Sequence, residues 1–141
     1  MHKLWILGGL LLSLACADID LVADLGITHA ELLQKKGIPN SILPIRQKIA
    51  DEDDVVFVYT DSYFYLYNNH FYRAFFSKRY EGEIHKGLKI GSPRSAVTAL
   101  WGNKYDIEKD GLVWYRDGYI VVAKIDKDNR LESLWLIMDA R

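Results

Sequence analysis

Cysteine is nearly absent from this sequence, because Cys16 is the only one among 141 residues. A single thiol cannot form a disulfide within the chain. Stability must therefore come from an apolar core rather than from a disulfide framework. Half of the residues are hydrophobic and 13% are aromatic, which is enough to build such a core.

An excess of charge is missing as well. The chain has 18 Lys and Arg against 19 Asp and Glu, which gives a formal net charge of −1. Nucleic-acid-binding domains usually carry a basic patch or stripe, so we expect no nucleic-acid partner. Proline is also scarce, with three residues, and two of them, Pro39 and Pro93, stand where a helix ends or begins.

Recognisable catalytic and metal-binding motifs are lacking. The four histidines show no pair with metal-ligand spacing, and no cysteine beyond the leader is available as a nucleophile. Residues 126–130 begin like a calcium-binding loop, but Leu131 stands where glycine is required, so we expect a hairpin turn. The sequence thus predicts a protein that is not an enzyme, with no catalytic residues, no metal site and no cofactor.

Long hydrophobic runs are confined to Leu4–Leu14, behind Lys3. Such a run is too short to span a bilayer and has the length expected for the centre of a signal peptide. We therefore expect residues 1–17 to be a leader. Cleavage after Ala17 would release a soluble periplasmic or secreted protein. The segment 12–16 also resembles a bacterial lipobox, and we favour this alternative, in which Cys16 is lipidated and anchors an exported protein to a membrane of the cell envelope.

Two short helices can be predicted from their end signals. Thr28 and Glu31 form a capping box, and Gly37 ends the helix that follows. Ser92 is the expected N-cap of a second helix, with Pro93 in its first turn and Gly102 after its last residue.

Strands are expected at 55–67, 71–76, 112–125 and 131–137, where β-branched and aromatic residues gather. Residues 40–54 fit either a strand or a helix followed by a loop, and the acidic run 51–54 is expected to be a solvated loop tip.

The order of these features occurs twice. Gly26 and Gly91 are 65 residues apart, as are Gly37 and Gly102. The predicted fold is therefore α+β, with two tandem copies of a helix packed on an antiparallel β-meander, at residues 25–80 and 88–138. Two copies are too few for a solenoid, so we expect their apolar faces to pack together into one common core.

This pattern resembles the helix-and-meander unit of the SmpA/OmlA outer-membrane lipoproteins, and in doubled form the tandem repeat of the β-lactamase inhibitor protein family. The resemblance rests on Gly26, Thr28, Leu32, Gly37, Tyr59, Phe71, Ala74 and Phe76, and on Ile90, Gly91, Ser92, Val97, Gly102, Tyr115, Val121, Leu131, Leu134 and Leu136. It implies a BLIP-like or SmpA/OmlA-like fold, and a role in envelope assembly or as an inhibitor-like binder. The chain lacks the disulfides of the inhibitor family.

The aromatic residues supply the candidate binding site. Alternation places Ala74, Phe76, Leu134 and Leu136 toward the core, which turns Arg73, Phe75 and Trp135 outward. Tyr63 and Tyr65 lie on one side of their strand, but whether that side is inner or outer remains open, because the matching positions of the second copy favour an inward direction. Exposed Tyr, Trp and Arg side chains are typical anchors of protein interfaces.

The resulting hypothesis is a secreted or lipid-anchored, non-catalytic envelope protein that binds another protein through an open sheet face. The alternative is a small-ligand-binding protein with an aromatic cleft between the two repeats. An enclosed pocket of several hundred Å³ would favour the ligand binder, whereas a flat aromatic patch would favour the protein binder.

Overall fold

The computed structural model describes residues 20–46, 48 and 54–139. The leader, Cys16 and most of the acidic run 51–54 lie outside the described residues. In the ranges that are described, no helix has the length and apolar character needed to cross a membrane.

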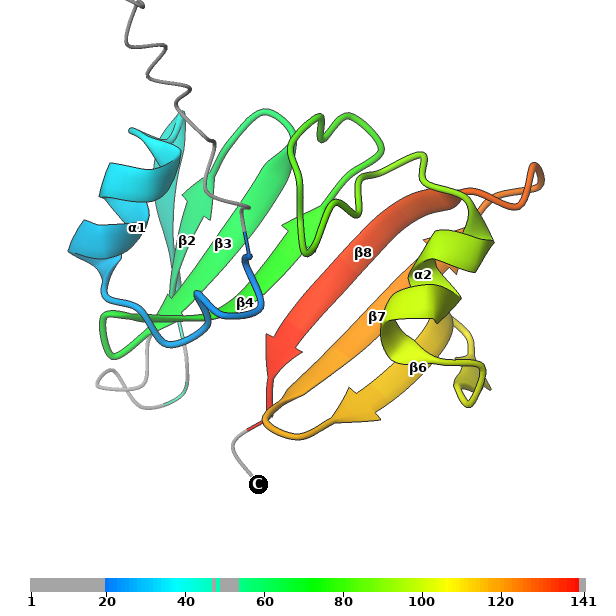
Figure 1. Cartoon of the computed structure of the whole chain (residues 1–141). Helices are drawn as coiled ribbons and strands as arrows, with labels where there is room; N and C mark the ends of the chain where they lie inside the picture. The colour runs from blue at the N-terminus through cyan, green and yellow to red at the C-terminus, as the bar shows by residue number, and fades with distance from the viewer. Residues whose placement is uncertain (1–19, 47, 49–53, 140–141) are drawn as a thin grey trace, which may run out of the picture.

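The described residues form one antiparallel sheet of eight strands, with two short helices, and Figure 1 shows their arrangement. The sheet order is β1-β2-β3-β4-β8-β7-β6-β5. In chain order the elements are α1 (His29–Lys36), β1 (Ser41–Ile45), β2 (Asp54–Val58), β3 (Ser62–Tyr67), β4 (His70–Phe76), α2 (Arg94–Trp101), β5 (Asp106–Glu108), β6 (Gly111–Arg116), β7 (Tyr119–Ile125) and β8 (Leu131–Met138).

The expectation of two tandem helix-on-meander repeats is wrong. Strand β8 pairs with β4 along Arg73–Phe76, so the strands of both halves of the chain merge into a single sheet. The two helices have only eight residues each, and their buried side chains belong to one common core cluster. Similar local patterns recur in the sequence because both halves follow a helix with antiparallel strands. Periodicity cannot show that the strands then join across β4 and β8.

Both helices are defined by their ends. Thr28 Oγ1 accepts a hydrogen bond from the Glu31 backbone N–H, which is one half of the predicted capping box. The Glu31 carboxylate accepts from the Thr28 hydroxyl rather than from the Thr28 N–H. Gly37 and Gly102 close the helices with φ of 79° and 92°, a conformation that favours glycine. Ser92 does not cap α2, because the N-cap is Pro93 and the Ser92 hydroxyl accepts from Lys89 N–H instead.

The core lies between the helices and one face of the sheet, which is called the inner face below. Leu32 of α1 and Val97 and Trp101 of α2 are buried there against strand residues such as Phe64 and Leu134. Ala74, Phe76, Leu134 and Leu136 are fully buried on this face, as predicted. Figure 1 shows α1 beside β2 and β3 and α2 over β7 and β6.

Two irregular segments complete the core between the helices. The N-terminal segment 20–27 and the connector 77–93 contribute Leu21, Tyr80, Ile84 and Leu88. Leu21 N–H donates to the Ile84 carbonyl, and His85 Nδ1 lies 2.7 Å from Asp20 Oδ1. His85 is buried and stacks on the Trp101 ring at 5.8 Å between centroids. The segment 20–27 is therefore attached to the body of the fold.

The predicted strand at 55–67 is a hairpin, because the chain turns at 59–61 and continues as β3. Residues 41–45, which fit either structure in the sequence, form the edge strand β1. Pro44 is tolerated there because an edge strand need not donate a hydrogen bond on its open side.

Candidate protein-binding face

The second face of the sheet, called the outer face below, is covered by neither α1 nor α2. Alternation along the paired strands places a nearly continuous apolar and aromatic surface there. Its residues are Val56, Val58, Tyr63, Tyr65, Phe75, Val113, Ile120, Val122, Trp135 and Ile137. Val56 and Val113 are buried although they lie outside the core cluster, so neighbouring side chains on the outer face bury them.

The predicted site residues meet at the middle of this face. Phe75 faces Trp135 across β4 and β8, with ring centroids 4.7 Å apart. Tyr63 stacks on Phe75 at 6.2 Å, and Tyr65 contacts Trp135 at 6.0 Å. The structure therefore brings all five predicted residues, including Arg73, into one cluster, and it places Tyr63 and Tyr65 on the outer side, the direction that the sequence left open. Whether this cluster binds a partner remains a prediction.

Arg73 lies over two adjacent rings of this cluster. Its guanidinium carbon is 4.1 Å from the centroid of Tyr65 and 4.9 Å from that of Trp135. The pairing register shifts between Tyr65 and Leu66, so that Tyr72 is an extra residue on β4, and its ring also contacts Tyr65. This β-bulge places Tyr72 and Arg73 side by side on the outer face.

The carboxylate of Asp54, on the same part of the sheet, accepts a hydrogen bond from a neighbouring side chain. The Tyr72 hydroxyl donates a short hydrogen bond to Asp54 Oδ2 of β2. Burial of the phenol and the adjacent Asp54 raise the pKa of Tyr72 well above its ordinary value of 10.0. Tyr72 therefore stays protonated and holds Asp54. Farther along the face, Lys124 and Glu132 form an ion pair at 3.2 Å.

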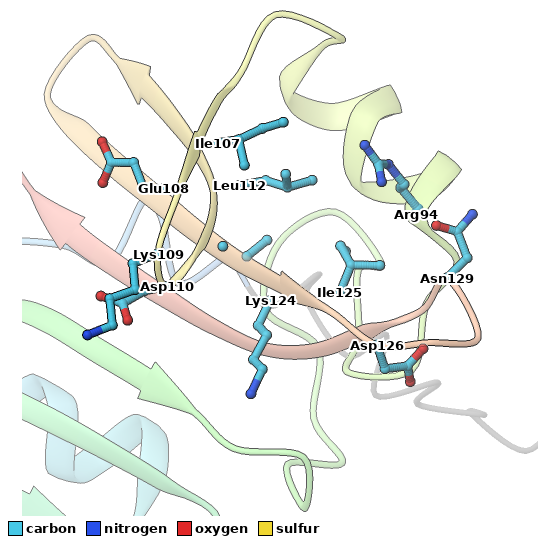
Figure 2. Close-up of a pocket in the computed structure, with 12 residues that line it drawn as sticks. Arg94, Ile107, Glu108, Lys109, Asp110, Leu112, Lys124, Ile125, Asp126 and Asn129 are labelled. Atoms are coloured by element: carbon cyan, nitrogen blue, oxygen red, sulfur yellow. The ribbon is translucent and has the colours of Figure 1, made fainter.

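A first cavity, of about 420 Å³, lies where β5, β6 and β7 approach the start of α2 (Figure 2). Figure 2 shows Ile107, Leu112 and Ile125 grouped at its centre, with Arg94 and Asn129 at one end and the turn residues Lys109 and Asp110 at the other. Charges of both signs line it, so its electrostatics favour neither a cation nor an anion.

A second cavity, of about 430 Å³, lies under the N-terminal end of α1. Val55, Phe57 and Leu66 line it, together with Ile42 and Leu33, and its polar contributors are His29, Asn68 and Asn69. The cavity lies within the first half of the chain, so it differs from the predicted cleft between two repeats.

Metal-binding geometry is not found in the part of the chain that the structure describes, because no three His, Cys, Asp or Glu side chains come together there.

The predicted hairpin turn at 126–130 is present. Asp126 Oδ1 accepts hydrogen bonds from the backbone N–H groups of Asp128 and Arg130. The aspartate that resembled a calcium ligand therefore stabilises the turn.

One polar cluster was missed by sequence reasoning. The Lys36 ammonium donates to the Tyr80 hydroxyl at 3.2 Å and lies within 6 Å of the rings of Tyr59, Phe64 and Tyr80. Burial lowers the pKa of Lys36 although the carboxylate of Asp61 opposes the shift, and burial raises the pKa of Tyr80 to about 12. No local pattern reveals this site, since its residues come from α1, β3 and the connector.

The fold recurs in parts of two secreted bacterial proteins. One is a cysteine-rich secretory protein from Staphylococcus aureus, with a TM-score of 0.61 and 12% identity over 83% of this chain. The other is an extracellular protein containing a SCP domain from Bacillus anthracis, with a TM-score of 0.64 and 13% identity over 87% of this chain. The matches cover 45% and 47% of those chains, so this chain spans less than half the length of each.

Sequence comparison adds no relative: no protein-family profile matches the chain, and no curated protein matches its sequence. The structural matches contradict the resemblance to the SmpA/OmlA lipoproteins and to the β-lactamase inhibitor protein. That resemblance rested on small residues and apolar periodicities, which many helix-and-strand units share. At this level of identity the matches establish the fold and leave the function open.

Proposed function

We propose that this chain is an exported, non-catalytic module that binds another protein through its outer sheet face. The observation that carries the proposal is the cluster of Arg73, Phe75 and Trp135 with Tyr63 and Tyr65, on a face that neither helix covers. Monomeric soluble proteins rarely leave large contiguous apolar patches in water, and such patches commonly mark interfaces.

The composition of the cluster supports a protein partner. Tyr, Trp and Arg are the residues that most often carry binding energy at interfaces. Their ring contacts hold the side chains in fixed positions before binding, which lowers the entropic cost of forming a complex. A flat aromatic surface of this kind fits the broad face of a protein better than it fits a small molecule.

Export is supported by two independent observations. The leader pattern of residues 1–17 is typical of exported bacterial proteins, and the two matching structures are of a secretory and an extracellular protein. Anchoring through a lipid on Cys16 is part of the same proposal. It would hold the module at a membrane of the envelope, where its partner would be an envelope or secreted protein.

Site-specific photo-crosslinking in the producing cells tests the binding face. A photoreactive p-benzoylphenylalanine is placed at residue 63, which is 40% exposed on the outer face, and in a matched strain at residue 38, which is 91% exposed near the end of α1. We expect residue 63 to give a discrete crosslinked protein that residue 38 does not give, and we expect Trp135→Ala to abolish it. Identical products from both positions, or none from residue 63, would refute the proposal.

The cavity under α1 favours a second function, binding of a small apolar ligand. Its largely apolar lining, its volume of about 430 Å³ and the polar groups of His29, Asn68 and Asn69 are typical of a ligand pocket. Titration of the purified protein with medium-chain fatty acids, monitored by amide NMR shifts, would test it. Saturable shifts at Leu33 and Leu66 that Leu66→Trp removes would support this alternative, and shifts that do not saturate would reject it.

A further inference from the structure

Arg73 is the one charged member of the aromatic cluster, and no carboxylate of the described residues pairs with its guanidinium. In the described ranges the Arg73 side chain forms no ion pair and no hydrogen bond. Its guanidinium makes cation–π contacts with the rings of Tyr65 and Trp135. Its Nε is cut off from solvent and has no hydrogen-bond partner. Nε is also the single buried side-chain nitrogen or oxygen without a hydrogen-bond partner in that part of the chain.

This arrangement makes the guanidinium of Arg73 a candidate binding group for an anion. Contact with two rings restricts the position of the guanidinium, and the fork of its terminal N–H groups matches a carboxylate in a bidentate manner. The neighbouring carboxylate of Asp54 is held by Tyr72, and Lys124 is paired with Glu132. Among the described residues Arg73 is therefore a cation without an ion-pair partner, and the side chains that it contacts are aromatic.

We infer that the partner presents an Asp or Glu side chain to Arg73, flanked by apolar side chains that cover Phe75 and Trp135. This inference rests on the proposed function and adds the chemistry of the partner. A protein carboxylate fits better than a phosphate group, because the surroundings of Arg73 on the sheet are aromatic and aliphatic rather than basic. When the complex forms, the apolar surroundings exclude water from the ion pair and strengthen it.

Peptides selected from a random phage-displayed library provide the probe. Selection uses the purified protein, and clones that also bind Trp135→Ala are discarded, so that only ligands of the outer face remain. We expect the remaining peptides to share an acidic residue between apolar residues. Their affinity should fall about ten- to a hundredfold with Arg73→Gln, since hydrogen bonds between charged groups contribute roughly 1.5–3 kcal/mol. Lys124→Gln, a cation of the same face that is already paired, is the matched control and should change affinity little.

A double-mutant cycle locates the contact. Replacing the acidic residue of the peptide with its amide should weaken binding to the wild type as much as Arg73→Gln does, and should have no further effect on that variant. This exchange in the peptide leaves the protein intact, so the test holds even if Arg73→Gln folds poorly.

The other outcomes separate the two proposals. The selected peptides could lack an acidic residue, and their affinity could be unchanged by Arg73→Gln. This result would overturn the inference but not the proposed function. A library that yields no clone sensitive to Trp135→Ala would count against both. Binding to phosphatidylglycerol vesicles that Arg73→Gln abolishes would assign the cation to a membrane surface and would also overturn the inference.

Discussion

Phe75 and Trp135 face each other across β4 and β8, with ring centroids 4.7 Å apart. The pair lies on the outer side of the strand junction that joins the two halves of the chain into one sheet. On the inner side of the same two strands, Phe76 faces Leu134, and both are fully buried. The junction thus has a packed inner side and a half-buried aromatic outer side, and substitutions on the two sides should behave differently.

Replacement of Trp135 should affect binding far more than folding. Trp135 is partly exposed and packs on Phe75 and Tyr65, so Trp135→Ala should lower the free energy of unfolding by about 1 kcal/mol, the value of one or two aromatic contacts. Trp114, whose side chain is fully buried on the inner face, is the matched control, and Trp114→Ala should cost roughly 3–5 kcal/mol. Urea denaturation measures both. Equal losses would mean that Trp135 belongs to the core.

Acid should weaken the attachment of the N-terminal segment through Asp20. Partial burial by itself raises the pKa of Asp20, but the hydrogen bonds from His85 and from backbone N–H groups outweigh it, and the pKa is lowered from 3.8. A carboxyl with a lowered pKa in the folded state stabilises the fold above pH 3.8, and this contribution is lost as the pH falls further. The unfolding free energy should therefore drop less between pH 7 and pH 3 in Asp20→Asn than in the wild type. Asp117→Asn, in the exposed turn between β6 and β7, should retain the full drop.

The amine of Lys36 should titrate apart from the other lysines. Desolvation lowers its pKa from 10.5, with an opposing effect of Asp61. After reductive methylation with labelled formaldehyde, NMR should show one dimethyl-lysine signal that shifts at a lower pH than the rest. Lys36→Arg should remove that signal, whereas Lys127→Arg, in an exposed turn, should leave it. An early signal that survives Lys36→Arg would contradict the assignment.

Gly111, the first residue of β6, should be the least replaceable of the described glycines. Its φ is +139°, and an added Cβ would lie 2.4 Å from the carbonyl oxygen of Ala123 on β7. Because that obstacle is backbone, Gly111→Ala should separate β6 from β7 and lower the unfolding free energy by about 3 kcal/mol or more, as strained and overpacked sites do. Gly118→Ala, with φ of +84° and open space around the Cβ, should cost about 1 kcal/mol. Thermal denaturation compares them.

Cys16 should determine whether the protein is in the membrane fraction or in the soluble fraction. If the lipobox is used, Cys16→Ala should move the protein from the membrane fraction to the soluble fraction. Intact-mass analysis should then show a diacyl or triacyl cysteine at the mature N-terminus of the wild type. An unmodified N-terminus at Asp18 would instead establish ordinary signal cleavage.

Local signals predicted the local structure well. The Thr28 N-cap, the glycines that close both helices and the alternation along β4 and β8 depend on a few neighbouring residues, and each is present. The second N-cap was misplaced by one residue, because Ser92 bonds backward to Lys89 rather than forward into the helix. Serine offers a hydroxyl to either side, and the sequence does not say which side is used.

Long-range relations could not be predicted. The pairing of Phe75 with Trp135 joins residues 60 positions apart, and several other pairings would satisfy the same alternation. The Lys36 cluster likewise depends on how α1 crosses β3 and the connector. The bulge that places Tyr72 on the same side of the sheet as Arg73 arises from one extra residue that no turn motif marks.

The position of β8 has a consequence for how the protein is made. The last strand of the described chain lies in the middle of the sheet, with β4 on one side and β7 on the other. Until Leu131–Met138 has left the ribosome, β4 has no neighbour on that side, and the core cannot close. Because contacts so distant in sequence form late, we expect the core to close only after β8 has paired with both β4 and β7.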